Sequence, residues 1–525
     1  MIPGARSWAW AIAVGLSGAV LLVLLSRSVI GHPVHYDELL HMLAARGLLQ
    51  TGVPVIADGL YERAELYTRA VAWSFREFGE SPVSARLPAL GAGAVLVFVV
   101  GAWVVRHAGL LAGLTAAILL CLVPTTVGVA VFARFYTMHA VVMTLVFISA
   151  YEALQPGRHV GVRAVLALAV VALIALGWHF QETTIIAAGA VVVAVVAVLV
   201  MDHWAQVRGL IARRPMLTLG SLAFGVLIAI FAVWYLGLLQ QLGSTALWAA
   251  GNATRYQYYL VEFRNDLPLL WPLLPVAAAI AVLNPAHRRL ALFCAVAIAA
   301  ALVVHSVAAQ KTMRYAYYLV PLMCVLWAIA LSTIAMEVPD RGAAVGRGTT
   351  ARATWLVLAL VAVSFVLSQE GARALNVLLG RTSNLANRPF ADEPDWTPIV
   401  AELAPRAHEA DRVVTSNSMK ALYYLGRYDY ELNATIVPET ESRSDFGLDA
   451  RTGRQAIGAP ESVRQVLDQP GTTMVVIETS KIGRASGVTT EALAVIESSC
   501  RELRLPANAA VRGWWCDAGP RAAGP

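Results

Sequence analysis

The chain has 525 residues, of which 58% are hydrophobic and only 14% are charged. A soluble globular protein carries about 25% charged residues, so the composition excludes an ordinary soluble enzyme. The formal net charge of +6 comes from arginines scattered over short connectors. Because they do not gather on one face, nucleic acid is not an expected partner. Apolar runs long enough to cross a bilayer recur through roughly the first 370 residues, which predicts a polytopic membrane protein.

We predict about 11 membrane-spanning helices from the apolar runs. The runs lie near 8–29, 88–105, 108–130, 139–155, 163–179, 184–201, 217–239, 268–284, 290–308, 315–336 and 354–371. Arginine-rich connectors fall on alternate sides of these runs, and such connectors mark the cytoplasm. The N-terminus is therefore predicted to be cytoplasmic and the C-terminal segment extracytoplasmic. The first run has no small-residue cleavage site and is interpreted as an uncleaved signal anchor.

Three regions are predicted to lie outside the membrane. In the long first loop, 31–87, "DELLHMLAARGLLQTG" and "ELYTRAVAWSFREFG" have helical periodicity and predict two short helices on the outer leaflet. An aromatic segment follows at 240–267. The predicted domains are a membrane domain, 1–381, which includes the first loop, and a soluble domain, 382–525.

Strands and helices alternate in the C-terminal segment, which predicts a small α/β domain. "DRVVTSN" and "TTMVVIET" are predicted strands, while "WTPIVAELAPRAHE" and "TEALAVIESSCREL" are predicted helices. Cys500 and Cys516 lie in this domain, where an oxidising compartment would allow a disulfide; the sequence leaves their pairing open.

Two adjacent acids, Asp37 and Glu38, follow the first apolar run in "HYDELLH". Asp37 could cap a helix, or act as a catalytic base. Either acid could bind a metal ion together with His35 or His41 from the same helix face. Metal binding is the weaker alternative, because the spacing is not HExxH and no further ligand cluster completes a coordination set.

Other polar residues occur at the predicted outer ends of the membrane helices. Arg134 and His139 lie in "VFARFYTMH", His179 and Glu182 in "WHFQETT", and Lys311, Arg314 and Tyr315 in "AQKTMRYAYYLVP". Polar groups at membrane depth are costly and point to function. Interfacial snorkelling explains a single lysine or arginine, but it explains Asp37, Glu38 and Glu182 less well.

The first loop resembles that of the GT-C membrane glycosyltransferases, in particular the protein O-mannosyltransferase and lipid A aminoarabinose transferase group. The resemblance is carried by the acidic pair, by "ARGLLQTG" and by "FGESPVSARLPA". "KTMRYAYYLVP" is similar to a later Arg-Tyr and Pro motif of the family. The chain departs from the family where relatives have a Lys-Pro-Pro element, for which Arg63 or Arg69 would have to substitute. It also has His139 where many relatives carry a second acid.

The resemblance implies transfer of a hexose or pentose from a polyprenyl-phosphate donor to a hydroxyl of a glycan, lipid or protein acceptor. Asp37 would be the general base, which inverts the anomeric configuration in a single displacement. Arg134, Lys311 and Arg314 would bind the donor phosphate. No cofactor is required, and a divalent metal is optional. Supporting or substrate-binding roles fall to the remaining candidates: His35, Glu38, His41, Arg63, His139, His179, Glu182 and Tyr315.

The predicted location is a bacterial inner membrane, because the composition, rich in Ala, Arg and Val, is typical of a bacterial protein. A transporter or lipid flippase is the main alternative. It predicts inverted repeats and ionisable residues near the helix midpoints, whereas the charges here lie at helix ends. A membrane scaffold is a third possibility, but it gives no reason for the acidic pair. The sequence does not identify the sugar or the acceptor.

Overall fold

The computed structural model describes residues 5–213, 254–308, 311–341, 372, 375–376, 379, 394–435, 446–449, 451–484, 486–506 and 510–517. Tertiary contacts divide the chain into two compact units. Unit 1 comprises Met1–Ile30 and Ala89–Asn387, and unit 2 comprises Gly31–Pro88 and Arg388–Pro525. The first loop thus belongs to the same unit as the C-terminal segment. The predicted domain boundary near 382 lies outside the described residues.

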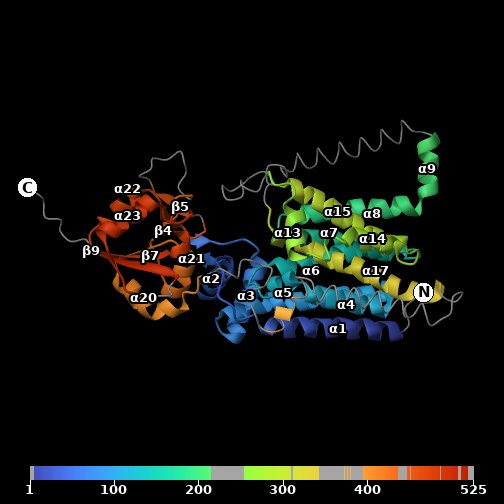
Figure 1. Ribbon diagram of the computed structural model, residues 1–525, viewed down its shortest axis with the longest axis horizontal. Coiled ribbons are helices and arrows are strands. Elements are labelled where there is room, and N and C mark those ends of the chain that lie inside the picture. Colours follow the sequence, from blue (N-terminus) through green and yellow to red (C-terminus); the bar gives the residue numbers. More distant parts are fainter. Residues whose placement is uncertain are drawn as a thin grey trace, which may run out of the picture. The chain divides into compact units, whose positions relative to one another are not determined.

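The described part of unit 1 is built from helices (Figure 1). They are α1 (Ala5–Arg27), α4 (Pro82–Leu122, which begins in unit 2), α5 (Pro124–Ala130), α6 (Tyr136–Ala153), α7 (Val160–Phe180), α8 (Thr184–Asp202), α9 (Trp204–Arg213), α13 (Tyr258–Asp266), α14 (Leu274–Leu283), α15 (Arg288–Val307), α16 (Met313–Ala316), η1 (Tyr317–Leu319) and α17 (Val320–Arg341).

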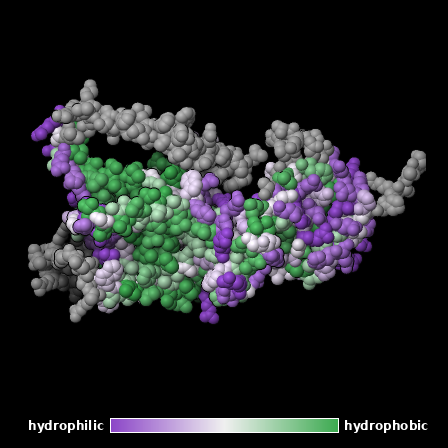
Figure 2. Space-filling model, turned by 180° about the vertical axis from the view of Figure 1, so that it is seen from behind, coloured by the Kyte–Doolittle hydropathy of each residue, from purple (hydrophilic) through white to green (hydrophobic). Residues whose placement is uncertain are grey.

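Within the described residues, six helical segments are long and apolar enough to cross a membrane. They are Ser7–Arg27, Pro82–Leu122, Val160–Phe180, Thr184–Asp202, Arg288–Val307 and Met313–Ala335. Helices α6 and α14 lie on two further predicted runs, and the predicted runs 217–239 and 354–371 lie outside the described residues. The chain is therefore a multi-pass membrane protein. On the face shown in Figure 2, a broad hydrophobic belt covers these helices.

The structure divides the apolar residues 88–130 at two points. Gly109 has φ 86° and ψ 175° inside α4, a backbone conformation that glycine adopts without steric cost, and it separates two helical stretches close to the predicted division between the runs 88–105 and 108–130. The prediction of one helix across 108–130 is wrong because of the second division. Helix α4 ends at Leu122, and α5 begins with Pro124 at its first turn, because proline lacks the N–H that would continue the preceding helix.

The N-terminal part of unit 2 contains both helices that were predicted for the first loop. Helices α2 (Tyr36–Thr51) and α3 (Glu65–Phe78) flank a short antiparallel hairpin, β1 (Val55–Ile56) and β2 (Gly59–Leu60). Gly52 and Gly79, each with φ 80°, end the two helices, as glycine commonly does at C-caps. Both helix predictions are confirmed.

The C-terminal part of unit 2 is an α/β domain with a seven-stranded sheet. The strands are β3 (Arg412–Thr415), β4 (Tyr430–Leu432), β5 (Gly447–Asp449), β6 (Arg454–Ile457), β7 (Thr472–Glu478), β8 (Arg501–Glu502) and β9 (Val511–Asp517). The helices are α20 (Thr397–Glu409), α21 (Ser418–Lys420), η5 (Ala421–Leu425), α22 (Pro460–Leu467), η6 (Thr479–Lys481) and α23 (Thr490–Ser499).

The sheet has the strand order β5-β6-β4-β3-β7-β9-β8. Strands β6, β4, β3 and β7 are parallel, and β5, β9 and β8 add antiparallel edges. Helices α22 and α23 lie on one face of the sheet and α20 on the other (Figure 1). Because both faces are covered, the central strands β3 and β7 are continuous apolar runs. This confirms the two predicted strands.

The disulfide between Cys500 and Cys516 forms, which settles a pairing that the sequence left open. The helix predicted over 490–503 ends earlier, at Ser499. Cys500 has extended backbone, φ −129° and ψ 154°, and leads into β8, which pairs with β9. The bond to Cys516 on β9 holds this segment against the sheet, so residues 501–502 form a strand instead of a last helical turn.

Candidate active site

Asp37 is the second residue of α2, and its side chain is half-buried. The helix cap is formed by His35, whose Nδ1 accepts a hydrogen bond of 2.9 Å from the Asp37 backbone N–H. Glu38 completes a capping box, because its Oε2 accepts a 3.0 Å hydrogen bond from the His35 N–H. The alternative in which Asp37 caps the helix is therefore wrong. Asp37 lies in the first turn of α2, beside this cap.

Glu38 is fully buried and paired with Arg86, near the start of α4. Arg86 Nε donates to Glu38 Oε1 at 2.8 Å, and Arg86 Nη2 donates to Oε2 at 2.7 Å. Arg86 Nη1 also donates to the His32 carbonyl oxygen at 2.8 Å. This bidentate ion pair, with the bond to the His32 carbonyl, holds the segment 32–38, which contains Asp37. Arg86 lies in "FGESPVSARLPA", one of the segments that carry the family resemblance. The resemblance did not identify it as the partner of Glu38.

The other predicted residues of the first loop have different surroundings. His41 is buried, with its Nδ1 2.9 Å from Thr68 Oγ1 and its ring edge-to-face with Tyr67. It therefore joins α2 to α3. Arg63 is exposed, and Arg69 pairs with Glu65 at 2.6 Å. Among the described residues, no group of three His, Cys, Asp or Glu side chains is arranged to hold a metal ion.

The α/β domain contacts the first loop on both sides of Asp37 in the sequence. The guanidinium of Arg451 lies 5.6 Å from the ring centroid of Tyr36, the residue before Asp37. Asp58, in the hairpin, accepts a 2.9 Å hydrogen bond from Arg454 Nε, and its N–H donates to the Thr452 carbonyl at 2.8 Å. These contacts, which sequence reasoning missed, make the first loop and the α/β domain one structural unit.

Two of the predicted phosphate-binding residues come together in unit 1. Arg134, in the turn after α5, and Arg314, on α16, lie over the same aromatic ring, that of Tyr136. Their Cζ atoms are 5.7 Å and 5.3 Å from its centroid, within the range of cation–π attraction. Phe132 lies 5.5 Å from Arg314 Cζ, and Tyr315 lies 6.3 Å from Tyr136, centroid to centroid. Because arginine binds phosphate bidentately, Arg134 and Arg314 are the candidate phosphate-binding residues of unit 1.

Lys311 lies three residues before Arg314, and its side chain is buried. Its Nζ is 6.0 Å from the ring centroid of Tyr256. The hydroxyl of Tyr259 donates a 3.3 Å hydrogen bond to the Thr312 carbonyl. Tyr256, just before α13, and Tyr259, in its first turn, thus contact the segment that begins with Lys311. Burial lowers the pKa of Lys311 from its ordinary value.

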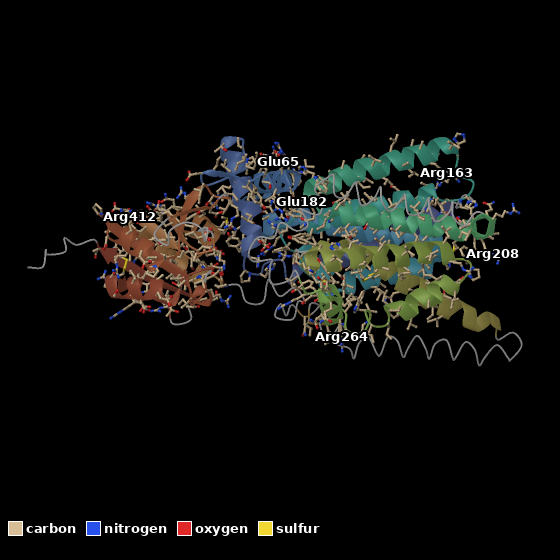
Figure 3. All side chains as sticks on the ribbon, turned by 90° about the horizontal axis from the view of Figure 1, so that it is seen from above. Glu65, Arg163, Glu182, Arg208, Arg264 and Arg412 are labelled. Carbon is tan, nitrogen blue, oxygen red and sulfur yellow. A yellow bond between two sulfur atoms is a disulfide. The ribbon has the colours of Figure 1, made fainter. Side chains whose placement is uncertain are left out.

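The last three candidates of unit 1 differ in burial: His139 is buried, whereas His179 and Glu182 are exposed. His139 Nε2 lies 2.9 Å from Thr184 Oγ1, and its ring is edge-to-face with Tyr318. His179 and Glu182 are exposed in the turn between α7 and α8. In Figure 3, Glu182 lies at one end of the helices of unit 1, and Arg163 and Arg208 lie at the other end. Asp37 belongs to unit 2 and the three cations to unit 1.

No protein-family model matches the chain, and no curated protein matches it. Solved structures do. ArnT from Cupriavidus metallidurans, bound to undecaprenyl phosphate, is 16% identical with a TM-score of 0.58, and the match covers 99% of this chain and 100% of that one. The oligosaccharyltransferase AglB from Archaeoglobus fulgidus, in complex with an inhibitory peptide and a dolichol-phosphate, is 13% identical with a TM-score of 0.51. That match covers 90% of this chain and 69% of AglB. The chain therefore shares the fold of these two proteins, which agrees with the fold that the sequence resemblance predicted.

Proposed function

We propose that the chain is a glycosyltransferase that moves a hexose or pentose from a polyprenyl-phosphate donor to a hydroxyl of an extracytoplasmic acceptor. The observation that carries the proposal is the meeting of Arg134 and Arg314 on the ring of Tyr136. The likeness to ArnT, whose structure holds undecaprenyl phosphate, supports the lipid-phosphate donor. The Cys500–Cys516 disulfide supports an oxidising, extracytoplasmic compartment for the α/β domain of a bacterial inner-membrane protein.

In the proposed reaction, Asp37 accepts the proton of the acceptor hydroxyl as its oxygen attacks the anomeric carbon. The bond between that carbon and the phosphate oxygen breaks, and the sugar inverts its configuration. The phosphate leaves with the negative charge, which Arg134, Arg314 and Lys311 stabilise. Because fixed cations supply this stabilisation, the proposal requires no divalent metal. Glu38 holds the base-carrying segment in place through Arg86.

Binding of the donor tests the proposal. Arg134→Ala and Arg314→Ala are each expected to weaken binding of undecaprenyl phosphate to the protein in nanodiscs about 10–100-fold. A charged hydrogen bond contributes about 1.5–3 kcal/mol, and 1.4 kcal/mol is tenfold. Arg208→Ala, at the other end of the unit 1 helices (Figure 3), is the matched control and should bind normally. Equal affinity in the wild type and the three variants would exclude a phosphate-binding site at Arg134 and Arg314.

The pH dependence of donor use tests Lys311. Because the charged form of a lysine exists only below its pKa, the lowered pKa of Lys311 means that its cation is lost at a lower pH than for an ordinary lysine. We expect the KM for the phosphodiester donor to rise roughly tenfold as the pH increases through that pKa. Lys311→Arg should move this rise out of the accessible range, because the guanidinium stays protonated. A KM profile that Lys311→Arg leaves unchanged would exclude a charge role for Lys311.

A further inference from the structure

A cleft of about 550 Å³ lies at the β8 edge of the C-terminal sheet. Its polar lining comes from three elements: Arg406 and Glu409 on the last turn of α20, Arg501 and Glu502 on β8 with Arg504 just after it, and Trp515 on β9. The volume is within the range of about 300–1,000 Å³ that is typical of ligand pockets. The opposite edge of the sheet, β5 and β6, is the one whose residues contact the first loop. The cleft is thus a separate feature from the segment that carries Asp37.

The indole of Trp515 is held in a fixed orientation in this cleft. Its Nε1 donates a 2.9 Å hydrogen bond to Asp517 Oδ1. Trp515 is paired across the strands with Arg501, and directly paired residues carry side chains about 5 Å apart on the same face. The Cys500–Cys516 disulfide joins the residues next to this pair. The cleft therefore offers a half-exposed aromatic face beside a guanidinium, both on covalently braced strands.

The arginines of the cleft are not used to hold the fold. Among the described residues, no side-chain hydrogen bond or ion pair engages Arg406, Arg501 or Arg504. Arg512, on the same strand as Trp515, contrasts with them, because it pairs with Glu497 and Glu502 at 2.9 Å and 2.8 Å. Because Arg512 is shared between Glu497 and Glu502, it does not cancel the charge of Glu502 alone. The cleft lining carries three arginines and two glutamates, and this net charge of +1 favours an anionic ligand.

We propose that this cleft binds an acidic saccharide segment of the acceptor, so that the acceptor is a glycan carrying carboxylate, phosphate or sulfate groups. The flat Trp515 ring can stack on the apolar face of a sugar, and guanidinium groups can bind its anionic substituents bidentately. Glu409 supplies an acceptor for sugar hydroxyl protons, which a ligand recognised by charge alone would not need. That the bound glycan is the acceptor rests on the proposed function. Binding of the glycan to the cleft does not depend on catalysis.

Binding of a defined probe tests the inference with the full-length protein in zwitterionic nanodiscs. We expect a labelled galacturonic acid tetramer to bind at least tenfold more tightly than neutral maltotetraose. Trp515→Ala and Arg504→Ala should each reduce this binding at least tenfold, whereas Trp515→Phe should retain most of it. Arg464→Ala, an exposed arginine on α22, is the matched control. Thermal melting of each variant shows whether it is folded; Arg504 is exposed, so Arg504→Ala stays informative if Trp515→Ala unfolds.

Several results would overturn the inference. Equal binding of the acidic and neutral tetramers, or unchanged binding in Trp515→Ala and Arg504→Ala, excludes the site. Equal competition by poly-glutamate or by anionic lipid vesicles shows a charge patch with no saccharide selectivity. Binding of undecaprenyl phosphate and transfer to a short neutral acceptor should be the same in wild type and in the control Arg464→Ala. If transfer is absent while the acidic tetramer still binds through Trp515, the proposed function fails and the site stands.

Discussion

Asp37→Asn is expected to lower the turnover number for sugar transfer about 10²–10⁴-fold, the contribution of a well-placed general base. The amide has nearly the same shape as the carboxylate but cannot accept a proton. The helix start should not change, because His35 and Glu38 form the capping box. Donor binding should also be retained, since Arg134 and Arg314 form the proposed phosphate site. The measurement is single-turnover transfer from a purified polyprenyl-phosphate sugar.

The matched control for this variant is Asp58→Asn. Asp58 is the other aspartate of the first loop, and its exposed carboxylate pairs with Arg454 at 2.9 Å. An exposed pair contributes about 0–1 kcal/mol, so this variant should transfer sugar at close to the normal rate. Full activity in Asp37→Asn would end the assignment of Asp37 as the base. Lipid translocation that persists in Asp37→Asn, with no transfer in either protein, would favour a flippase.

The features that the sequence predicted correctly depend on local patterns. Helical periodicity and a terminal glycine mark α2 and α3 over short windows, and the apolar runs of β3 and β7 report burial on both faces of a sheet. The helix cap shows the limit of such patterns. His35 with Glu38 three residues later has the spacing of a capping box, but aspartate is the more usual capping residue, so the sequence pointed to Asp37.

Partners that are distant in the sequence could not be predicted in this way. Arg86 lies 48 residues from Glu38, and Arg454 lies 396 residues from Asp58. Nothing in a single sequence says which of many arginines meets a given carboxylate, because tertiary packing decides it. The sequence predicted that Arg134 and Arg314 lie at helix ends, but it did not predict that both contact Tyr136. The ring that both of them contact is known only from the structure.

Breaking the Glu38–Arg86 pair is expected to destabilise unit 2 by about 3–5 kcal/mol, the cost of leaving one buried charge without its partner. Both side chains are fully buried, so water cannot replace the lost contact. Arg86→Met leaves the Glu38 carboxylate without its guanidinium, and it leaves the His32 carbonyl without its donor. We expect a fall of roughly 10 °C in the unfolding temperature, measured by tryptophan fluorescence in detergent. Transfer activity should be lost because the Asp37 segment is no longer held.

Arg46→Ala gives a matched comparison for the buried pair. Arg46 binds Glu80 through the same two guanidinium positions, Nε and Nη2, at 2.8 Å and 2.6 Å, but both side chains are about one-third exposed. Its loss should cost at most about 1 kcal/mol. Adding Glu38→Gln to Arg86→Met removes the buried charge and should recover part of the stability, because most of the cost is that of the unpaired carboxylate. If Arg86→Met melts like Arg46→Ala, the pair does not hold the α2 start. Inactivity of a stable Arg86→Met would then point to a direct role for Arg86 in the reaction.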